Sequence, residues 1–160
     1  MILISHRGNL SGINPKREND PKYIQEALDK GYCVEVDIRF SPYTKKFIFA
    51  HELGGPSYEV DFCWLSERKD KLFIHCKDIA SLQYFRESNY NFFYHSHEEY
   101  TVTSKGHILS HSKVMNNILD PEIDTEVNST ILMLPEKHGF GKEMVKYCYG
   151  VGSDMIGFYA

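Results

Sequence analysis

Short apolar runs that stop at ionisable residues recur through the first half of the chain. Three such runs are residues 2–5, 47–50 and 72–74, and each is followed directly by a histidine. A buried parallel strand gives this pattern when it ends in a polar loop at the edge of a sheet. We therefore expect several strands to bring histidines to one edge.

Residues 33–39 alternate strictly between apolar and polar side chains, which is the period of a β-strand. The apolar face would carry Val34, Val36 and Ile38, and the polar face Glu35, Asp37 and Arg39. Both carboxylates of this segment should therefore point the same way.

Helical signals separate the expected strands. Asp20 is an N-cap candidate before Pro21, apolar residues follow at helical spacing, and Gly31 is a plausible C-cap. Two further short helices are expected over residues 60–68 and 79–86.

Beyond residue 90 the pattern predicts mainly short strands. These are residues 92–94, 101–103, 107–109, 131–134 and 149–156, with a loop over 112–130 and a helix over 140–148. The sequence contains no internal repeat or linker, so we expect one domain over residues 1–160.

The alternation of strand, polar tip and helix predicts an α/β fold with a largely parallel sheet. About eight strand candidates favour a barrel. A (β/α)8 barrel normally takes about 250 residues, so we expect a compact, truncated (β/α)8 TIM-type barrel with several outer helices reduced to loops. Its site should lie at the carboxyl ends of the strands.

Composition and charge narrow the function classes. A net charge of -4 gives no reason to expect tight binding to nucleic acid or an anionic membrane. No apolar stretch is long enough for membrane insertion, and the opening run is too short for a secretory signal, so we expect a soluble, cytoplasmic protein. The four cysteines form no C-x-x-C pair and are expected to be buried free thiols.

The paired carboxylates are the first candidate site. Mg²⁺ and Ca²⁺ prefer carboxylate oxygens, and Glu35 and Asp37 are two residues apart on one strand, so both can reach one ion. An isolated E-x-D would more often line the solvated face of an edge strand. Here, neighbouring strands also end in His or Lys, which favours a site.

Breaking a phosphodiester needs one group that takes a proton from the nucleophile and another that donates one to the leaving oxygen. His6 and His51 are the candidates, each just past an apolar run. Arg7 and Lys77 would supply positive charge to phosphate oxygens and to the transition state.

The order and spacing of these residues resemble the glycerophosphodiester phosphodiesterase family of the phospholipase-C-like phosphodiesterase barrels. The resemblance is carried by His6-Arg7-Gly8, Glu18-Asn19, residues 27–38 and His51. It implies that His6 and His51 act as acid and base, and that Glu35 and Asp37 bind one divalent metal ion. Arg7 would contact the phosphate.

The chain departs from the family pattern at the fourth strand. The family has E-x-K there, with the glutamate completing the metal site, and this chain reads His75-Cys76-Lys77. Lys77 carries over, but the glutamate does not. His75 could ligate the metal instead, which would move the preference from Mg²⁺ or Ca²⁺ toward Mn²⁺ or similar ions, or weaken binding.

The sequence therefore predicts metal-dependent hydrolysis of a small-molecule phosphodiester, by water or through a cyclic phosphate. One alternative is a catalytically inactive phosphate- or metal-binding module on the same fold. Another is a sugar- or polymer-binding β-rich domain in which the histidines are incidental. Barrel sides left bare by missing helices would be apolar, which makes a homo-oligomer a reasonable hypothesis.

Overall fold

Parallel strands form the centre of the sheet. The computed structural model describes residues 1–111 and 130–160. In spatial order the parallel strands are β6 (Asn91–Phe93), β5 (Leu72–Cys76), β2 (Cys33–Phe40), β1 (Ile2–His6), β10 (Gly150–Ser153), β9 (Thr130–Met133) and β8 (Ile108–His111). The expectation of a largely parallel sheet is confirmed.

Three short strands add to this sheet in antiparallel fashion. They are β3 (Phe47–Phe49), β4 (Tyr58–Glu59) and β7 (Tyr100–Val102). The run over residues 47–50 is therefore the returning arm of a hairpin with β2, not a separate parallel strand. The hairpin places Ala50 beside Asp37, and the Ala50 N–H donates to the Asp37 carbonyl at 3.1 Å. His51 follows Ala50 directly and is therefore brought close to β2.

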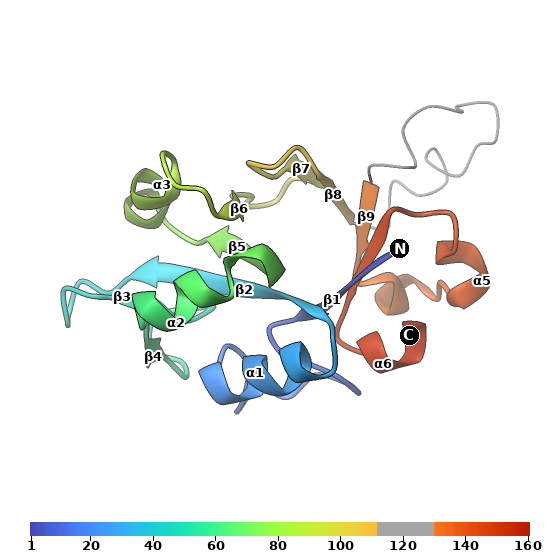
Figure 1. Cartoon of the computed structure of the whole chain (residues 1–160), viewed down its shortest axis with the longest axis horizontal. Coiled ribbons are helices and arrows are strands. Elements are labelled where there is room, and N and C mark those ends of the chain that lie inside the picture. The colour runs from blue at the N-terminus through green and yellow to red at the C-terminus, as the bar shows by residue number, and fades with distance from the viewer. Residues whose placement is uncertain (112–129) are drawn as a thin grey trace.

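The sheet curls, as Figure 1 shows, so that β6 approaches the β7–β8 hairpin. The Ser104 N–H donates to the Phe92 carbonyl at 2.7 Å, and the Thr101 hydroxyl donates to the Tyr94 carbonyl at 2.9 Å. Within the described residues, no strand ladder joins β6 to β7 or β8. The fold is a mixed α/β curled sheet consistent with a truncated barrel.

The outer face of β2 packs against helices. Val34, Val36 and Ile38 are fully buried in one cluster with residues of α1 (Pro21–Asp29), α2 (Phe62–Glu67) and α3 (Ile79–Phe85). Burying each such side chain contributes roughly 1.5–3 kcal/mol. The strand's period of two then turns Glu35 and Asp37 to the concave face, as the alternation predicts.

Apolar residues fill the floor of the concave face. They come from β1, β5, β6, β8 and β9 and are Ile4, Phe73, Phe93, Leu109, Ile131 and Met133. Gly152 on β10 leaves space there, because a Cβ at this position would collide with the Met133 thioether. This floor supports the polar residues above it.

The helix boundaries confirm some predictions and correct others. The Asp20 side chain caps α1 through the Lys22 N–H, as expected. The predicted helix over residues 140–148 is only the four-residue α5 (Lys142–Val145), which follows the 3₁₀ turn η4 (Pro135–His138). A second 3₁₀ turn, η1 (Lys69–Lys71), precedes β5.

The last strand also ends earlier than predicted. β10 stops at Ser153 because the chain turns there, with the Asp154 N–H donating to the Glu136 carboxylate at 2.9 Å. The helix α6 (Ile156–Tyr159) follows and packs on β1 and β10. The predicted loop over 112–130 lies outside the described residues except for Thr130, which begins β9.

All four cysteines are free, but the expectation that all are buried is wrong. Cys76 and Cys148 are buried, whereas Cys63 is exposed in the first turn of α2. In the described part of the chain, no helix has the length and apolar character that crossing a membrane requires.

Candidate active site

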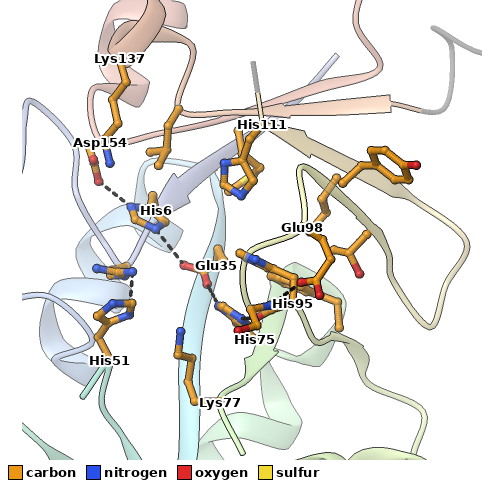
Figure 2. A pocket seen from close by; sticks show the side chains of 18 of the residues that line it. His6, Glu35, His51, His75, Lys77, His95, Glu98, His111, Lys137 and Asp154 are labelled. Atoms are coloured by element: carbon orange, nitrogen blue, oxygen red, sulfur yellow. Dashed lines mark hydrogen bonds and ion pairs between the residues drawn. The ribbon is translucent and has the colours of Figure 1, made fainter. Parts of the chain in front are cut away.

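A pocket of about 450 Å³ opens at the carboxyl ends of the parallel strands. Figure 2 shows its side chains converging from β1, β2, β5, β8 and the loops that follow strands. Six of the seven residues singled out from the sequence line it: His6, Arg7, Glu35, His51, His75 and Lys77. The seventh, Asp37, is fully buried next to them.

The two carboxylates of β2 are buried rather than solvated, at 2% exposure for Glu35 and 0% for Asp37. Asn19 holds Asp37 from two sides, donating to its Oδ2 at 3.0 Å and accepting its N–H at 2.9 Å. Burial alone would raise the pKa of Asp37, but the His51 and His75 rings and the Arg7 charge outweigh burial and hold this pKa well below its usual range. Asp37 is therefore ionised at neutral pH.

His75 faces both carboxylates from the neighbouring strand. It is directly opposite Asp37 in the β2–β5 register, and its Nδ1 is 3.1 Å from Asp37 Oδ1 and 3.5 Å from Glu35 Oε1. Burial lowers the pKa of His75, but the two adjacent carboxylates reverse this effect and raise it to about 9.

These three residues form a candidate metal centre. One ligand atom from each of Glu35, Asp37 and His75 falls within 4.8 Å of the others. Glu35 Oε2 and Asp37 Oδ1 are buried and accept no well-directed hydrogen bond from the described residues. A buried carboxylate oxygen without a donor is costly unless a cation lies beside it, so the donor set and its unsatisfied oxygens fit a divalent ion.

His6 is held by a second carboxylate at the end of β10. Its Nδ1 is 2.7 Å from Asp154 Oδ1, while its Nε2 is 3.7 Å from Glu35 Oε2. Asn9 also donates to Asp154 Oδ1, at 2.8 Å. Burial raises the pKa of Asp154, but the hydrogen bonds from His6 and Asn9 and the His6 charge lower it overall, so Asp154 is an acceptor for the His6 ring.

His51 and Arg7 meet beside Asp37. The Arg7 Nη2 atom is 2.7 Å from His51 Nδ1, and Arg7 Nε is 2.8 Å from Asp37 Oδ2. Arg7 Nη1 also donates to Glu18 Oε2 at 3.2 Å. Burial lowers the pKa of Arg7, but the charges of Asp37, Glu35 and Glu18 raise it overall, so this guanidinium is an ionised part of the network.

Lys77 is held less tightly than Arg7. Its Nζ is 3.9 Å from Asp37 Oδ1, and the amine donates no hydrogen bond to the described residues. Its side chain points into the pocket in Figure 2. Lys77 is therefore the cation of this group that is freer to meet a ligand.

The backbone at His6-Arg7-Gly8 is bent sharply to place these side chains. Arg7 adopts the left-handed conformation at φ 56°, and Gly8 follows at φ 91°. A Cβ on Gly8 would approach the Tyr23 ring to 2.9 Å, so this turn needs glycine to pack on α1. Non-glycine residues in this region cost roughly 1–3 kcal/mol and gather at functional sites.

Sequence reasoning missed other residues of the pocket or gave them too little weight. Asp154 and His95 were not among the seven residues singled out, yet both line the pocket, and His95 stacks on His75 with ring centroids 4.5 Å apart. His111 and Lys137 also line the pocket. The rule that polar residues gather after parallel strands would have identified Asp154, His95 and His111, since each ends or closely follows one.

Comparison with known proteins adds support at the level of the fold. No protein-family model and no curated protein matches the chain. Among solved structures, it is similar to a glycerophosphodiester phosphodiesterase from Thermotoga maritima, with a TM-score of 0.51 and 14% sequence identity. The match covers 99% of this chain and 97% of that one, so the likeness extends over the whole curled α/β sheet.

Proposed function

We propose that this protein hydrolyses a small phosphodiester of the glycerophosphodiester class, using one divalent metal ion and two histidines. The observation that carries the proposal is the buried cluster of Glu35, Asp37 and His75, which shares one pocket with His6 and His51. The family resemblance of the sequence and the fold of the phosphodiesterase neighbour support the same substrate class.

Glu35, Asp37 and His75 would hold the metal ion. When bound, such an ion neutralises phosphate charge and makes the phosphorus easier to attack. The proton transfers would be carried out by side chains of the protein.

The hydrogen-bond network favours His6 as the base. Asp154 is an ionised acceptor at His6 Nδ1, which places the ring proton on that nitrogen. The lone pair of His6 Nε2 is then free to take a proton from the nucleophile. The nucleophile is water or a neighbouring hydroxyl of the substrate.

The remaining histidine, His51, would then be the acid. Its Nδ1 is 2.7 Å from Arg7 Nη2, which can only donate, and 3.3 Å from Asp37 Oδ2, which can only accept, so these two contacts position the ring without fixing its tautomer. As the imidazolium, His51 would pass its Nε2 proton to the leaving oxygen, and the Asp37 carboxylate beside the ring would stabilise the positive charge. Arg7 would therefore position His51 and Asp37, and Lys77 would contact the phosphate oxygens.

The test is hydrolysis of bis(p-nitrophenyl) phosphate and glycerophosphocholine by the chain with EDTA, Mg²⁺, Ca²⁺ or Mn²⁺. We expect metal-dependent turnover that His6→Ala lowers by about 10²- to 10⁴-fold, the usual contribution of general acid–base catalysis. His138→Ala removes an exposed histidine outside the pocket and serves as the matched control. Phosphate binding without turnover under any condition would overturn the proposal in favour of a binding module.

A further inference from the structure

His75 is the residue in which the metal cluster departs from the family that the sequence resembles, since that family has a glutamate at this position. The side chain is only 4% exposed, and β5 places it directly opposite Asp37. A glutamate would offer oxygen to an ion here, whereas His75 offers nitrogen.

The surroundings of His75 fix which ring nitrogen faces the cluster. Its Nε2 is 3.3 Å from the His95 carbonyl oxygen, which can only accept, so Nε2 carries a proton. The ring also stacks on Phe93 and His95, with centroids 4.8 and 4.5 Å away. A metal-ligating histidine typically donates its other N–H to a carbonyl or carboxylate in this way.

The remaining nitrogen, Nδ1, faces the two carboxylates of β2, nearest to Asp37 Oδ1 and Glu35 Oε1. It is within 3.5 Å of an oxygen of both Asp37 and Glu35. An ion bound by all three residues would meet two carboxylate oxygens and one imidazole nitrogen.

We propose that this centre selects a first-row transition ion, Mn²⁺, Co²⁺ or Zn²⁺, over Mg²⁺ and Ca²⁺, with His75 Nδ1 as the selecting ligand. The inference rests on the metal site of the proposed function. Mg²⁺ and Ca²⁺ are hard ions bound by oxygen, whereas imidazole suits the transition ions. Replacing one carboxylate by a neutral ring also removes a negative charge on which the hard ions depend.

The test is calorimetric titration of the EDTA-treated full chain with each of the five ions, without substrate. Transition ions bind most nitrogen-containing sites more tightly than Mg²⁺ does, so the decisive quantity is the change in preference between the native chain and His75→Glu. We expect His75→Glu to lower the ratio of Mn²⁺ to Mg²⁺ affinity by at least about tenfold. Substitutions of residues that support metal ligands typically change metal affinity by about 10- to 100-fold, and replacing a ligand should change it at least as much. An unchanged ratio in a folded variant would overturn the inference.

Two further measurements separate this site from other histidines and from a misfolded variant. The double variant His97→Ala/His138→Ala removes exposed imidazoles and should keep the preference, whereas Glu35→Gln should lose the tight binding. Pulsed electron paramagnetic resonance of the Mn²⁺-loaded native chain needs no variant at the site and should show coupling to one ¹⁴N nucleus. Absence of that coupling in a chain that binds Mn²⁺ at Glu35 would also overturn the inference.

Failure of this inference is distinguishable from failure of the proposed function. Ion binding is measured without any substrate, so a chain that selects Mn²⁺ through His75 but hydrolyses nothing would contradict only the function. A chain that hydrolyses diesters equally well with Mg²⁺, and binds both ions equally, would contradict only the selectivity.

Discussion

The two sides of the pocket differ sharply in charge. The side built from β1, β2 and β5 carries ionised or ion-paired groups on almost every residue: Arg7, Glu35, Asp37, His75 and Lys77. The neutral side, formed by β8 and β9, carries His111 next to the apolar Leu109 and Met133, and the charged Lys137 and Glu98 line the pocket from segments outside these two strands. Burial lowers the pKa of His111, and nearby cations lower it further, so this imidazole is neutral at pH 7.

The two sides of the pocket are therefore suited to different parts of the substrate. A phosphate is an anion and belongs on the charged side, where Lys77 is available and the metal cluster lies. The neutral side suits an uncharged, hydroxyl-bearing alcohol, because an imidazole can exchange hydrogen bonds with it and apolar residues can pack against its carbons. Substitutions on the charged side should therefore affect the chemical step, and those on the neutral side mainly substrate affinity.

The largest effect is expected for Glu35→Gln on the charged side. Losing one anionic ligand should weaken metal binding, and we expect kcat/KM to fall by about 1000-fold, because a metal supplies several kcal/mol of transition-state stabilisation. Steady-state kinetics at a fixed metal concentration checks this. Glu87→Gln changes an exposed glutamate that is paired with Arg86 and should have native kinetics. Equal activity of the two variants would contradict the metal assignment.

A smaller loss is expected for Lys77→Ala, which tests whether this amine contacts phosphate. We expect kcat to fall by about 100-fold, as when a donor to a developing oxyanion is removed. The exposed Lys22→Ala is the matched control. Inorganic phosphate should also inhibit the Lys77 variant more weakly than the native chain, and unchanged inhibition would place the phosphate elsewhere.

Asp154→Asn should lower kcat by about tenfold to 100-fold, since a hydrogen bond to a charged group contributes about 1.5–3 kcal/mol. The amide no longer acts as an anionic acceptor that fixes the His6 tautomer, so KM should change little while kcat falls. Asp154→Glu should restore part of kcat. A variant with raised KM and unchanged kcat would show that Asp154 supports only the shape of the pocket.

The smallest effect is expected for His111→Ala on the neutral side. We expect a rise in KM of a few-fold with nearly unchanged kcat, since one hydrogen bond contributes about 0.5–1.5 kcal/mol. Parallel kinetics of the exposed His97→Ala provide the reference. If His111→Ala lowered kcat as far as Lys77→Ala, the two sides of the pocket would not differ as described.

Local sequence patterns correctly predicted the features that depend on residues close together in the sequence. The alternation over residues 33–39 correctly placed Glu35 and Asp37 on the concave face, because the period of a strand is set by its own backbone. The rule that polar residues follow buried strands placed His6, His51 and His75 near one another, although His51 arrives through an antiparallel hairpin.

Contacts between residues far apart in the sequence could not be predicted from such local patterns. The His6–Asp154 pair joins residues 148 positions apart, and its formation depends on β1 pairing with β10. The stacking of His95 on His75 depends on β5 pairing with β6, so no sequence pattern local to His95 indicates it. The single-domain and homo-oligomer expectations stay predictions.

The central claim is tested by ³¹P nuclear magnetic resonance of glycerophosphocholine that has been incubated with the native chain and Mn²⁺, or with Glu35→Gln and Mn²⁺. The paramagnetic Mn²⁺ is removed on a chelating resin before the spectra are recorded, because it broadens phosphate signals. We expect the diester signal to be replaced by a phosphomonoester signal, directly or through a cyclic phosphate, in the native sample and not in the variant. An unchanged diester signal in the native sample, with the metal bound, would contradict the claim that this pocket cleaves glycerophosphodiesters.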